Sequence, residues 1–317
     1  MKLYSGSLDI DSMKNVKLIH VFYPHKISKY LGYLLGIIWA DIVYLPKGEV
    51  CRWNKFWIKL LGKKSFKTVE GIYGEEMLGQ ILDSGKSYES FLDSFKGYDR
   101  VYSITAFLKK YNEEHHGIKT EDKILYLGTD TSLFLNEDKK IDELKNIIFI
   151  GRLKKRKGIF DFLEAAKSFP NIHFHIAGNG EEKEAIESFI AENGMKNVSL
   201  LGTLSHKELA EKLKQMDLHV FPSRSEGFPK VTLETAAAGV PSVVYPDYGA
   251  EEWIESGIDG FIVKDVEEIK DLIAELQKNP KKLREVSKNS IELGKRFDWK
   301  IVIKDWESVI EELHESR

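Results

Sequence analysis

The chain contains one cysteine, Cys51, among 317 residues, and only 8 prolines. A lone cysteine excludes an internal disulfide and fits a reducing compartment. The longest uncharged apolar run lies between Lys29 and Asp41, which is too short to span a bilayer. The amino terminus has no apolar segment of the signal-peptide type. Together these absences predict a cytoplasmic protein.

Strong net charge is also missing. The formal charge is −3 at pH 7, so the protein as a whole offers no electrostatic attraction for nucleic acid. The composition is that of a globular enzyme, with 42% apolar and 31% charged residues. A chain of this length is long for a single hydrophobic core and suits two domains.

Short β-type runs alternate with helical patterns, which predicts an α/β fold with parallel sheets and crossover helices. In the first half the expected strands are Lys17–Phe22, Asp41–Leu45, Phe66–Glu70, Arg100–Ser103 and Lys123–Tyr126. In the second half they are Asn146–Ile150, Ile172–Ala177, Val198–Leu201, Leu218–Phe221, Pro241–Tyr245 and Gly260–Ile262. The polar stretch Asn136–Lys145 has no apolar face to bury and is the predicted linker. We therefore expect lobes at 1–135 and 146–300, with a C-terminal helix over 301–317 that is able to cross back.

Two basic residues, Arg152 and Lys157, follow the expected strand 146–150. Gly151 lets the chain turn, and a helix begins near Gly158. Ligands bind at the carboxyl ends of parallel strands, and two cations beside a helix amino terminus suit a pyrophosphate. Further basic residues crowd the same turn, so a solvated basic loop is the alternative.

Two acidic residues, Glu226 and Glu234, lie eight apart in the segment PSRSEGFPKVTLETAAAGVPSVV. A loop that ends at Pro229, with a helix from about Lys230, would direct free backbone N–H groups at a phosphate or a sugar hydroxyl. Glu226 can accept hydrogen bonds from sugar hydroxyls, and Glu234 can bind a vicinal diol such as ribose. The alternative is one helix cap and one surface residue.

Six motifs follow one another along 146–300: Gly151-Arg152-Leu153 with Lys157-Gly158, His175 to Gly180, Val198 to Leu204, Glu226 to Glu234, Ala237 to Val243, and Phe297-Asp298-Trp299. In this order they resemble the donor lobe of the retaining GT-B glycosyltransferases of family 4 (glycosyl transferases group 1). The first lobe matches this family only in its second half.

The resemblance implies two Rossmann-like doubly wound α/β lobes, the first short, and a retaining hexosyltransferase. Its donor would be a UDP- or GDP-sugar, and its acceptor a glycan, a lipid-linked or another surface-polysaccharide acceptor. Arg152, Lys157 and Glu226 are the implied catalytic residues: the two cations hold the diphosphate, and Glu226 positions the sugar. Glu234 would bind the ribose. The other implied donor contacts are Gly151, Gly178, Asn179, Gly180, Thr203, Leu204, Gly227, Phe228, Pro229, Lys230 and Val231.

No metal and no other cofactor is expected, because side-chain cations would face the leaving group. The one Asp-x-Asp spelling, Asp9-Ile10-Asp11, is interpreted as a turn. The family usually opens with a strand and a Gly-Gly loop, and Ser5-Gly6-Ser7 is the nearest equivalent. Where the family often places a histidine, this chain has Glu70, which either contacts the sugar, acts as an acceptor-side base, or only ends a strand.

The segment 47–67 holds seven basic residues and one acid. Within it, Trp53, Phe56, Trp57, Leu60 and Leu61 recur at helical spacing. A basic amphipathic helix of this kind can lie in a membrane interface. A crossover helix with its apolar stripe on the sheet is the other option, and a doubly wound lobe needs such helices. The neighbouring apolar run between Lys29 and Asp41 favours a peripheral membrane contact.

Other functions fit parts of the pattern. The segment IAGNGEEK follows a strand, as in nucleotide-cofactor oxidoreductases, but Lys183 stands where the dinucleotide fingerprint needs a third Gly or Ala. A GT-B-like phosphorylase or epimerase, and a catalytically degenerate partner subunit, remain as alternatives. The four charged residues Arg152, Lys157, Glu226 and Glu234 argue against the degenerate subunit when they occur together.

Overall fold

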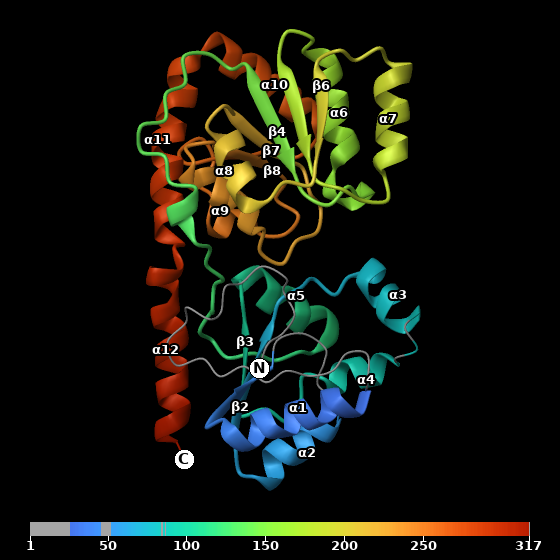
Figure 1. Ribbon diagram of the computed structural model, residues 1–317, viewed down its shortest axis with the longest axis vertical. Helices are drawn as coiled ribbons and strands as arrows, with labels where there is room; N and C mark the ends of the chain where they lie inside the picture. The colour runs from blue at the N-terminus through green and yellow to red at the C-terminus, as the bar shows by residue number, and fades with distance from the viewer. Residues whose placement is uncertain (1–25, 46–51, 84, 86, 317) are drawn as a thin grey trace.

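The computed structural model describes residues 26–45, 52–83, 85 and 87–316 (Figure 1). Its strands form two parallel sheets, one of three strands and one of six. We call the elements from α1 to α5 the first lobe, and those from β4 to α11 the second lobe. The expected strand Lys17–Phe22 and the Ser5-Gly6-Ser7 segment lie outside the described residues.

The first lobe is built on the sheet β1-β2-β3, in which all neighbours are parallel. Five of the six residues of β2 are buried, as expected for a central strand covered on both faces. The strands predicted in this region at 41–45, 66–70 and 100–103 are confirmed. The elements are α1 (Lys26–Trp39), β1 (Ile42–Tyr44), α2 (Arg52–Leu60), β2 (Lys64–Val69), α3 (Glu75–Asp83), α4 (Tyr88–Asp93), β3 (Arg100–Ser103) and α5 (Ala106–His116).

The predicted strand Lys123–Tyr126 is wrong. Only Ile124 forms an isolated bridge, with Ser103 at the end of β3. The amide of Leu125 still donates to the carbonyl of Ser103 at 2.9 Å. Pairing ends there, and the next carbonyl, that of Tyr126, accepts a 2.9 Å hydrogen bond from the indole of Trp306.

The second lobe has the strand order β6-β5-β4-β7-β8-β9, all parallel. All six strands predicted for it are confirmed. The order reverses between β4 and β7, which places a topological switch point at the carboxyl ends of these two strands. The strands are β4 (Asn146–Ile150), β5 (His173–Ala177), β6 (Val198–Gly202), β7 (Leu218–Phe221), β8 (Ser242–Val244) and β9 (Phe261–Ile262).

Helices connect these strands, and α8, α10 and α11 begin at residues whose side chains cap them. Ser205 and Glu208 form a reciprocal capping box at α8, and Asp265 caps α10. Pro280 follows the cap Asn279 in the first turn of α11, where its missing N–H costs nothing. The helices are α6 (Ile159–Ser168), α7 (Lys183–Glu192), α8 (His206–Leu213), α9 (Lys230–Ala237), α10 (Val266–Lys278) and α11 (Pro280–Arg296), with short 3-10 turns η2 (Thr131–Leu133), η3 (Lys155–Lys157) and η4 (Ala250–Glu252).

The connection 136–145 has no helix or strand. The expectation that it buries nothing is wrong, since Ile141 and Leu144 are 2% and 4% exposed within the main core. Burial of these two side chains in the core holds the irregular segment against the protein.

The last helix, α12 (Trp299–Glu315), returns to the first lobe, as the sequence allowed. Figure 1 shows α11 and α12 running along one side of both lobes. The ring of Trp306 packs edge-on against Tyr44 of β1 at 5.5 Å and against Phe66 of β2 at 6.3 Å. Within the described residues, no helix is long and apolar enough to cross a bilayer.

Candidate functional site

The loops that follow β4, β5 and β7 are packed tightly at the switch point. Gly158 has φ +73°, and a Cβ atom there would lie 2.0 Å from the carbonyl oxygen of Pro222. Gly178 has φ +144°, and its Cβ would lie 1.8 Å from the carbonyl oxygen of Gly151. Only glycine permits both the backbone conformation and the close approach. These glycines bring the predicted motifs into one place.

Lys157 and Glu226 meet across this switch point. The Lys157 ammonium pairs with Oε1 of Glu226, and the two side chains are 15% and 11% exposed. The same oxygen accepts a 2.6 Å hydrogen bond from the hydroxyl of Ser223. Burial lowers the pKa of Lys157, while Glu226 acts to raise it. A buried cation of this kind is retained when a partner charge and a hydrogen bond compensate its desolvation.

Arg152 differs from Lys157 in its surroundings. Its side chain is exposed, and this side chain forms no ion pair or hydrogen bond with any residue that the structure describes. It lies near enough to Lys157 that its charge also contributes to lowering the pKa of that residue, after burial and beside Arg156. An exposed guanidinium next to a second cation is suited to bind an anion with two oxygens.

Glu234 lies in the first turns of α9 and is only 9% exposed. Its Oε1 accepts a 3.4 Å hydrogen bond from the hydroxyl of Thr129, which comes from the connection between the lobes. Burial raises the pKa of Glu234, and the charges of His206 and Lys230 act against this shift. Among the described residues, no group donates a hydrogen bond to the second carboxylate oxygen, so Glu234 retains accepting capacity.

The loop before α9 is anchored by Phe228, which is buried against the rings of Trp253 at 4.9 Å and Phe297 at 5.6 Å. Its side chain points into the protein, so any ligand contact there involves the backbone. Pro229 is the N-cap of α9 and gives no side-chain cap, and Lys230 is exposed. The amino end of α9 therefore lacks a side-chain partner of its own.

The loops after β5 and β6 border the site on the β6 side of the sheet. The amide of Gly178 donates to the carbonyl of Gly202 at 2.8 Å, and Leu153 donates to the carbonyl of Asn179 at 3.0 Å. Thr203 is exposed and Leu204 is half-buried. The predicted donor residues of β4, β5 and β6 thus form one edge.

The first lobe reaches this edge through Glu70, directly after β2. A Cβ atom at Gly227 would lie 2.0 Å from the carbonyl oxygen of Glu70, so the two chains touch. The Glu70 carboxylate accepts hydrogen bonds from the hydroxyls of Thr68 at 2.8 Å and Tyr44 at 3.2 Å. The carboxyl end of β2 therefore faces the loop that carries Glu226.

Comparison with known proteins decides the family. The sequence model of the protein family described as "Glycosyl transferases group 1" matches residues 133–293, about half of the chain. The chain belongs to the glycosyl transferases group 1 family. The predicted family and GT-B fold are confirmed.

Relatives and solved structures of this family are similar over most of the chain. An uncharacterized glycosyltransferase of Methanocaldococcus jannaschii is 25% identical over 80% of this chain and 71% of its own. The alpha-galactosylglucosyldiacylglycerol synthase of Streptococcus pneumoniae is 29% identical over 66% of this chain and 54% of its own. Among structures, Anabaena HepE in complex with UDP has a TM-score of 0.75 at 17% identity, covering 90% of this chain and 82% of its own.

Ser223 and Thr129 are contacts that sequence reasoning missed in this glycosyltransferase. Ser223 is fully buried three residues before Glu226, and Thr129 lies in the crossover segment LYLGTDTSLF. The three-residue spacing between Ser223 and Glu226 could have indicated that the serine hydroxyl donates to this carboxylate. Nothing in the sequence pointed to Thr129, because its partner is 105 residues away.

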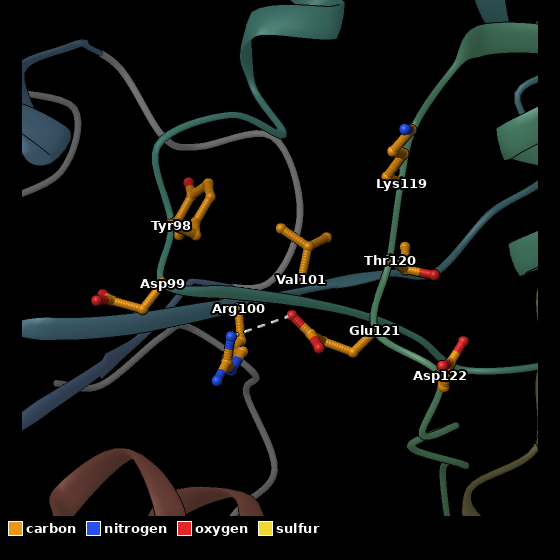
Figure 2. Close-up of a pocket in the computed structure, with 8 residues that line it drawn as sticks. All are labelled: Tyr98, Asp99, Arg100, Val101, Lys119, Thr120, Glu121 and Asp122. Atoms are coloured by element: carbon orange, nitrogen blue, oxygen red, sulfur yellow. Dashed lines mark ion pairs between the residues drawn. The ribbon is translucent and has the colours of Figure 1, made fainter. Parts of the chain in front are cut away.

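A hollow of about 280 Å³ lies elsewhere, at the amino end of β3 (Figure 2). Arg100 and Glu121 form an ion pair of 3.6 Å beside it. Parallel strands place this hollow at the sheet edge opposite Glu70, and none of the predicted site residues lines it. No group of three or more His, Cys, Asp or Glu side chains in the described part of the chain is arranged to hold a metal.

Proposed function

We propose that this glycosyltransferase is a retaining, metal-independent hexosyltransferase that uses a UDP- or GDP-sugar. One observation carries the proposal: the buried Lys157–Glu226 pair lies at the switch point beside the exposed Arg152. Two cations and one carboxylate leave a net positive charge where a diphosphate would bind. Ligands of open parallel sheets bind at such a point.

The catalytic roles follow from charge. Arg152 and Lys157 hold the donor diphosphate and offset the negative charge that develops as the glycosidic bond breaks. Glu226 fixes the Lys157 ammonium through Oε1 and offers its other oxygen to a hydroxyl of the donor sugar. Preorganised charges of this type supply a large share of such catalysis. No metal ion is needed, since side chains meet the leaving group.

The remaining donor contacts surround this centre. Glu234, oriented by Thr129, accepts hydrogen bonds from the ribose diol. Gly227, Pro229 and Val231 are placed to contribute backbone groups at the amino end of α9. The nucleotide and its base are bordered by Gly151, Gly178, Asn179, Gly180, Thr203, Leu204, Phe228 and Lys230.

The acceptor side belongs to residues 1–135, and the donor side to 146–300. Glu70 contacts the donor sugar or an acceptor hydroxyl, because its backbone lies where the first lobe touches the Glu226 loop. The acceptor is a glycan, a lipid-linked or another surface-polysaccharide acceptor, and the enzyme works at the cytoplasmic face of a membrane. The similarity to a synthase named for a glycosylated diacylglycerol supports a lipid-linked acceptor.

Nucleotide binding tests the proposal first. Thermal unfolding should be shifted upward by UDP or GDP but not by AMP, and the shift should be lost in Glu234→Ala or Arg152→Ala. Lys155→Ala is the matched control, because Lys155 is an exposed cation of the same turn. Absence of any shift with both diphosphates would contradict the donor site.

Product analysis tests the reaction. Incubation with a sugar nucleotide that binds and with an acceptor should release the nucleoside diphosphate and join the sugar to an acceptor hydroxyl. NMR of this product should show the anomeric configuration of the donor. Release of a sugar 1-phosphate that requires added phosphate would indicate the phosphorylase alternative instead. Interconversion of the sugar without transfer would indicate an epimerase.

A further inference from the structure

The two helices at the end of the first lobe expose an uncharged apolar face. The outward side chains of α1 and α2 include Leu35, Ile38, Trp39, Trp53, Phe56 and Leu60. We call these six residues the α1–α2 face. Trp39, Phe56 and Leu60 are 62%, 56% and 59% exposed. Contiguous apolar surface of this kind marks an interaction site.

The α1–α2 face is continuous across both helices. The rings of Tyr30 and Trp53 pack edge-on at 6.3 Å, and the Lys63 ammonium donates to the carbonyl of Ile38 at 3.1 Å. The inward sides are separate: Ile37 and Ile58 are buried together in a small core. α2 connects the parallel strands β1 and β2, so the prediction of a crossover helix is confirmed. The prediction that its apolar stripe faces inward is wrong for most of the stripe, of which Trp57 alone packs against the small core.

The reason is visible in the burial of α2. The residues turned toward the lobe are Asn54 and Ile58, both fully or nearly fully buried. Trp53, Phe56 and Leu60 fall on the other sides of the helix, at 43% to 59% exposure. Helical spacing alone predicted the stripe, but only the packing showed which side faces out.

The two helices themselves carry charge of one sign. Neither helix contains an aspartate or a glutamate, and both contain basic residues. Arg52 and Lys59 are exposed. Tryptophan, aliphatic side chains and cations on two helices without acids complement the interface of an anionic bilayer, where apolar groups enter the acyl boundary and cations remain at the headgroups.

Part of the basic excess of 47–67 is engaged within the lobe. Lys67 is 1% exposed, beneath the ring of Phe95 at 5.1 Å. Lys55 pairs with Asp93 at 3.8 Å, and Lys64 with Asp99 at 3.7 Å. The exposed Arg52 and Lys59 remain to face a membrane, so binding should depend mainly on the apolar side chains and only modestly on salt.

From these observations we infer that the α1–α2 face inserts into the interfacial zone of an anionic phospholipid bilayer. Figure 1 shows both helices at the end of the first lobe away from the second lobe, so docking there leaves the second lobe in water. This arrangement serves an enzyme with a water-soluble donor and a membrane-held acceptor. The inference rests on the proposed function only where it assumes a membrane-held acceptor. Binding to the bilayer itself can be measured without any transfer reaction.

Vesicle co-sedimentation tests the inference, with phosphatidylcholine alone and with phosphatidylcholine mixed with phosphatidylglycerol. Leu35→Ser/Trp39→Ser/Phe56→Ser should weaken binding about tenfold or more, because exposed apolar groups drive interfacial partition. The control Ile301→Ser/Ile303→Ser/Ile310→Ser removes three apolar side chains of α12 that are 39% to 51% exposed, and should bind as the wild type does. Arg52→Glu/Lys59→Glu should reduce binding only to the anionic vesicles.

Three outcomes would overturn the inference: a wild type that ignores both vesicles, a triple-serine variant that binds normally, or a wild-type dimer that this variant converts to monomer while neither binds lipid. The last would assign the face to a second copy of the chain. Nucleotide-induced thermal shifts in every variant report an intact second lobe. Their absence in the wild type would contradict the donor site while leaving the vesicle result valid.

Discussion

The two lobes differ in how completely they bury their apolar side chains. Twelve of the large apolar residues that are exposed belong to the first lobe: Tyr30, Leu31, Leu35, Ile38, Trp39, Trp53, Phe56, Leu60, Leu61, Met77, Leu82 and Tyr88. Between β4 and α11, among described residues, Ile258 is the one comparable case. In the second lobe, β7 and β8 are buried at every residue, while the edge strand β6 is partly exposed.

This difference separates two tasks. The second lobe holds a set of charged residues at a rigid switch point, which requires close packing of glycine turns against neighbouring loops. The first lobe brings Glu70 against the loop that carries Glu226, and it presents apolar surface outward. Each prediction below tests one side of this contrast, in order of decreasing effect.

The largest effect is expected from the cations of the second lobe. Lys157→Ala or Arg152→Ala should lower the transfer rate by about 10²–10³ fold, as removal of one preorganised electrostatic contact does. Initial rates with a saturating purified donor measure this, with Lys155→Ala as the control at the same turn. Near-normal activity of either variant would refute the diphosphate assignment and remove the functional contrast between the lobes.

The next effect concerns the core of the second lobe. Burial lowers the pKa of His219 to about 3, against an ordinary value of 6.5. Between these values the unfolded chain binds a proton that the folded chain does not, so stability falls as pH falls from about 6.5 to 3, by about 1.4 kcal/mol per pH unit for this group. Above pH 6.5 the group has no effect.

Urea unfolding of the wild type and His219→Gln at several pH values measures this. The variant should lose stability less steeply below pH 6.5, whatever its stability at neutral pH, because it lacks the titrating ring. His219 contacts Ser242 at 2.9 Å and Thr235 at 3.4 Å, so some loss at neutral pH is expected as well. Parallel slopes for the two proteins would show that His219 is not held neutral.

A smaller effect is expected where the lobes meet. The Glu252 carboxylate of the second lobe accepts hydrogen bonds from the first two amides of α5, Ala106 at 2.8 Å and Phe107, and from the Tyr126 hydroxyl at 3.1 Å. It thereby caps a helix of the first lobe. Glu252→Ala should lower the free energy of unfolding by about 1–2 kcal/mol, as loss of a cap does.

Glu251→Ala is the matched control, because Glu251 is the exposed neighbour in the same turn. Equal melting temperatures for the two variants would mean that the lobes are not joined through this carboxylate.

Removal of metal should have no effect. Exhaustive EDTA treatment should leave the transfer rate unchanged, because the leaving group is met by Arg152, Lys157 and the amino end of α9. Assay with and without added Mn²⁺ measures this. A complete loss that Mn²⁺ restores would assign the charge compensation to a metal site.

Sequence reasoning was most successful in the second lobe. Its six strands are continuous apolar runs bounded by Gly, Pro and polar turns, and such local patterns survive without tertiary information. Lys157 and Glu226 lie at a fixed spacing from a strand end and a helix start, and the structure brings them together. The roles of Arg152, Lys157, Glu226 and Glu234 in a donor site stay predictions. The ordered set of motifs in 146–300 identified the family.

The remaining features were decided by tertiary structure, because they depend on contacts between residues far apart in the sequence and on which side of a helix faces the core. The hydrogen bond of Thr129 to Glu234 and the caps that Glu252 provides join residues more than 100 positions apart. Pairing in the strand expected at Lys123–Tyr126 ends at Leu125, and Trp306, from the last helix, binds the next carbonyl.

The outward side of α2 shows the same division. Helical period determines which residues share a stripe, and so Trp53, Phe56 and Leu60 were grouped correctly from sequence. The period does not say which side packs against the sheet, because that depends on what neighbouring strands and helices offer. Here the lobe buries Asn54 and Ile58 instead, and the apolar stripe is left for another partner.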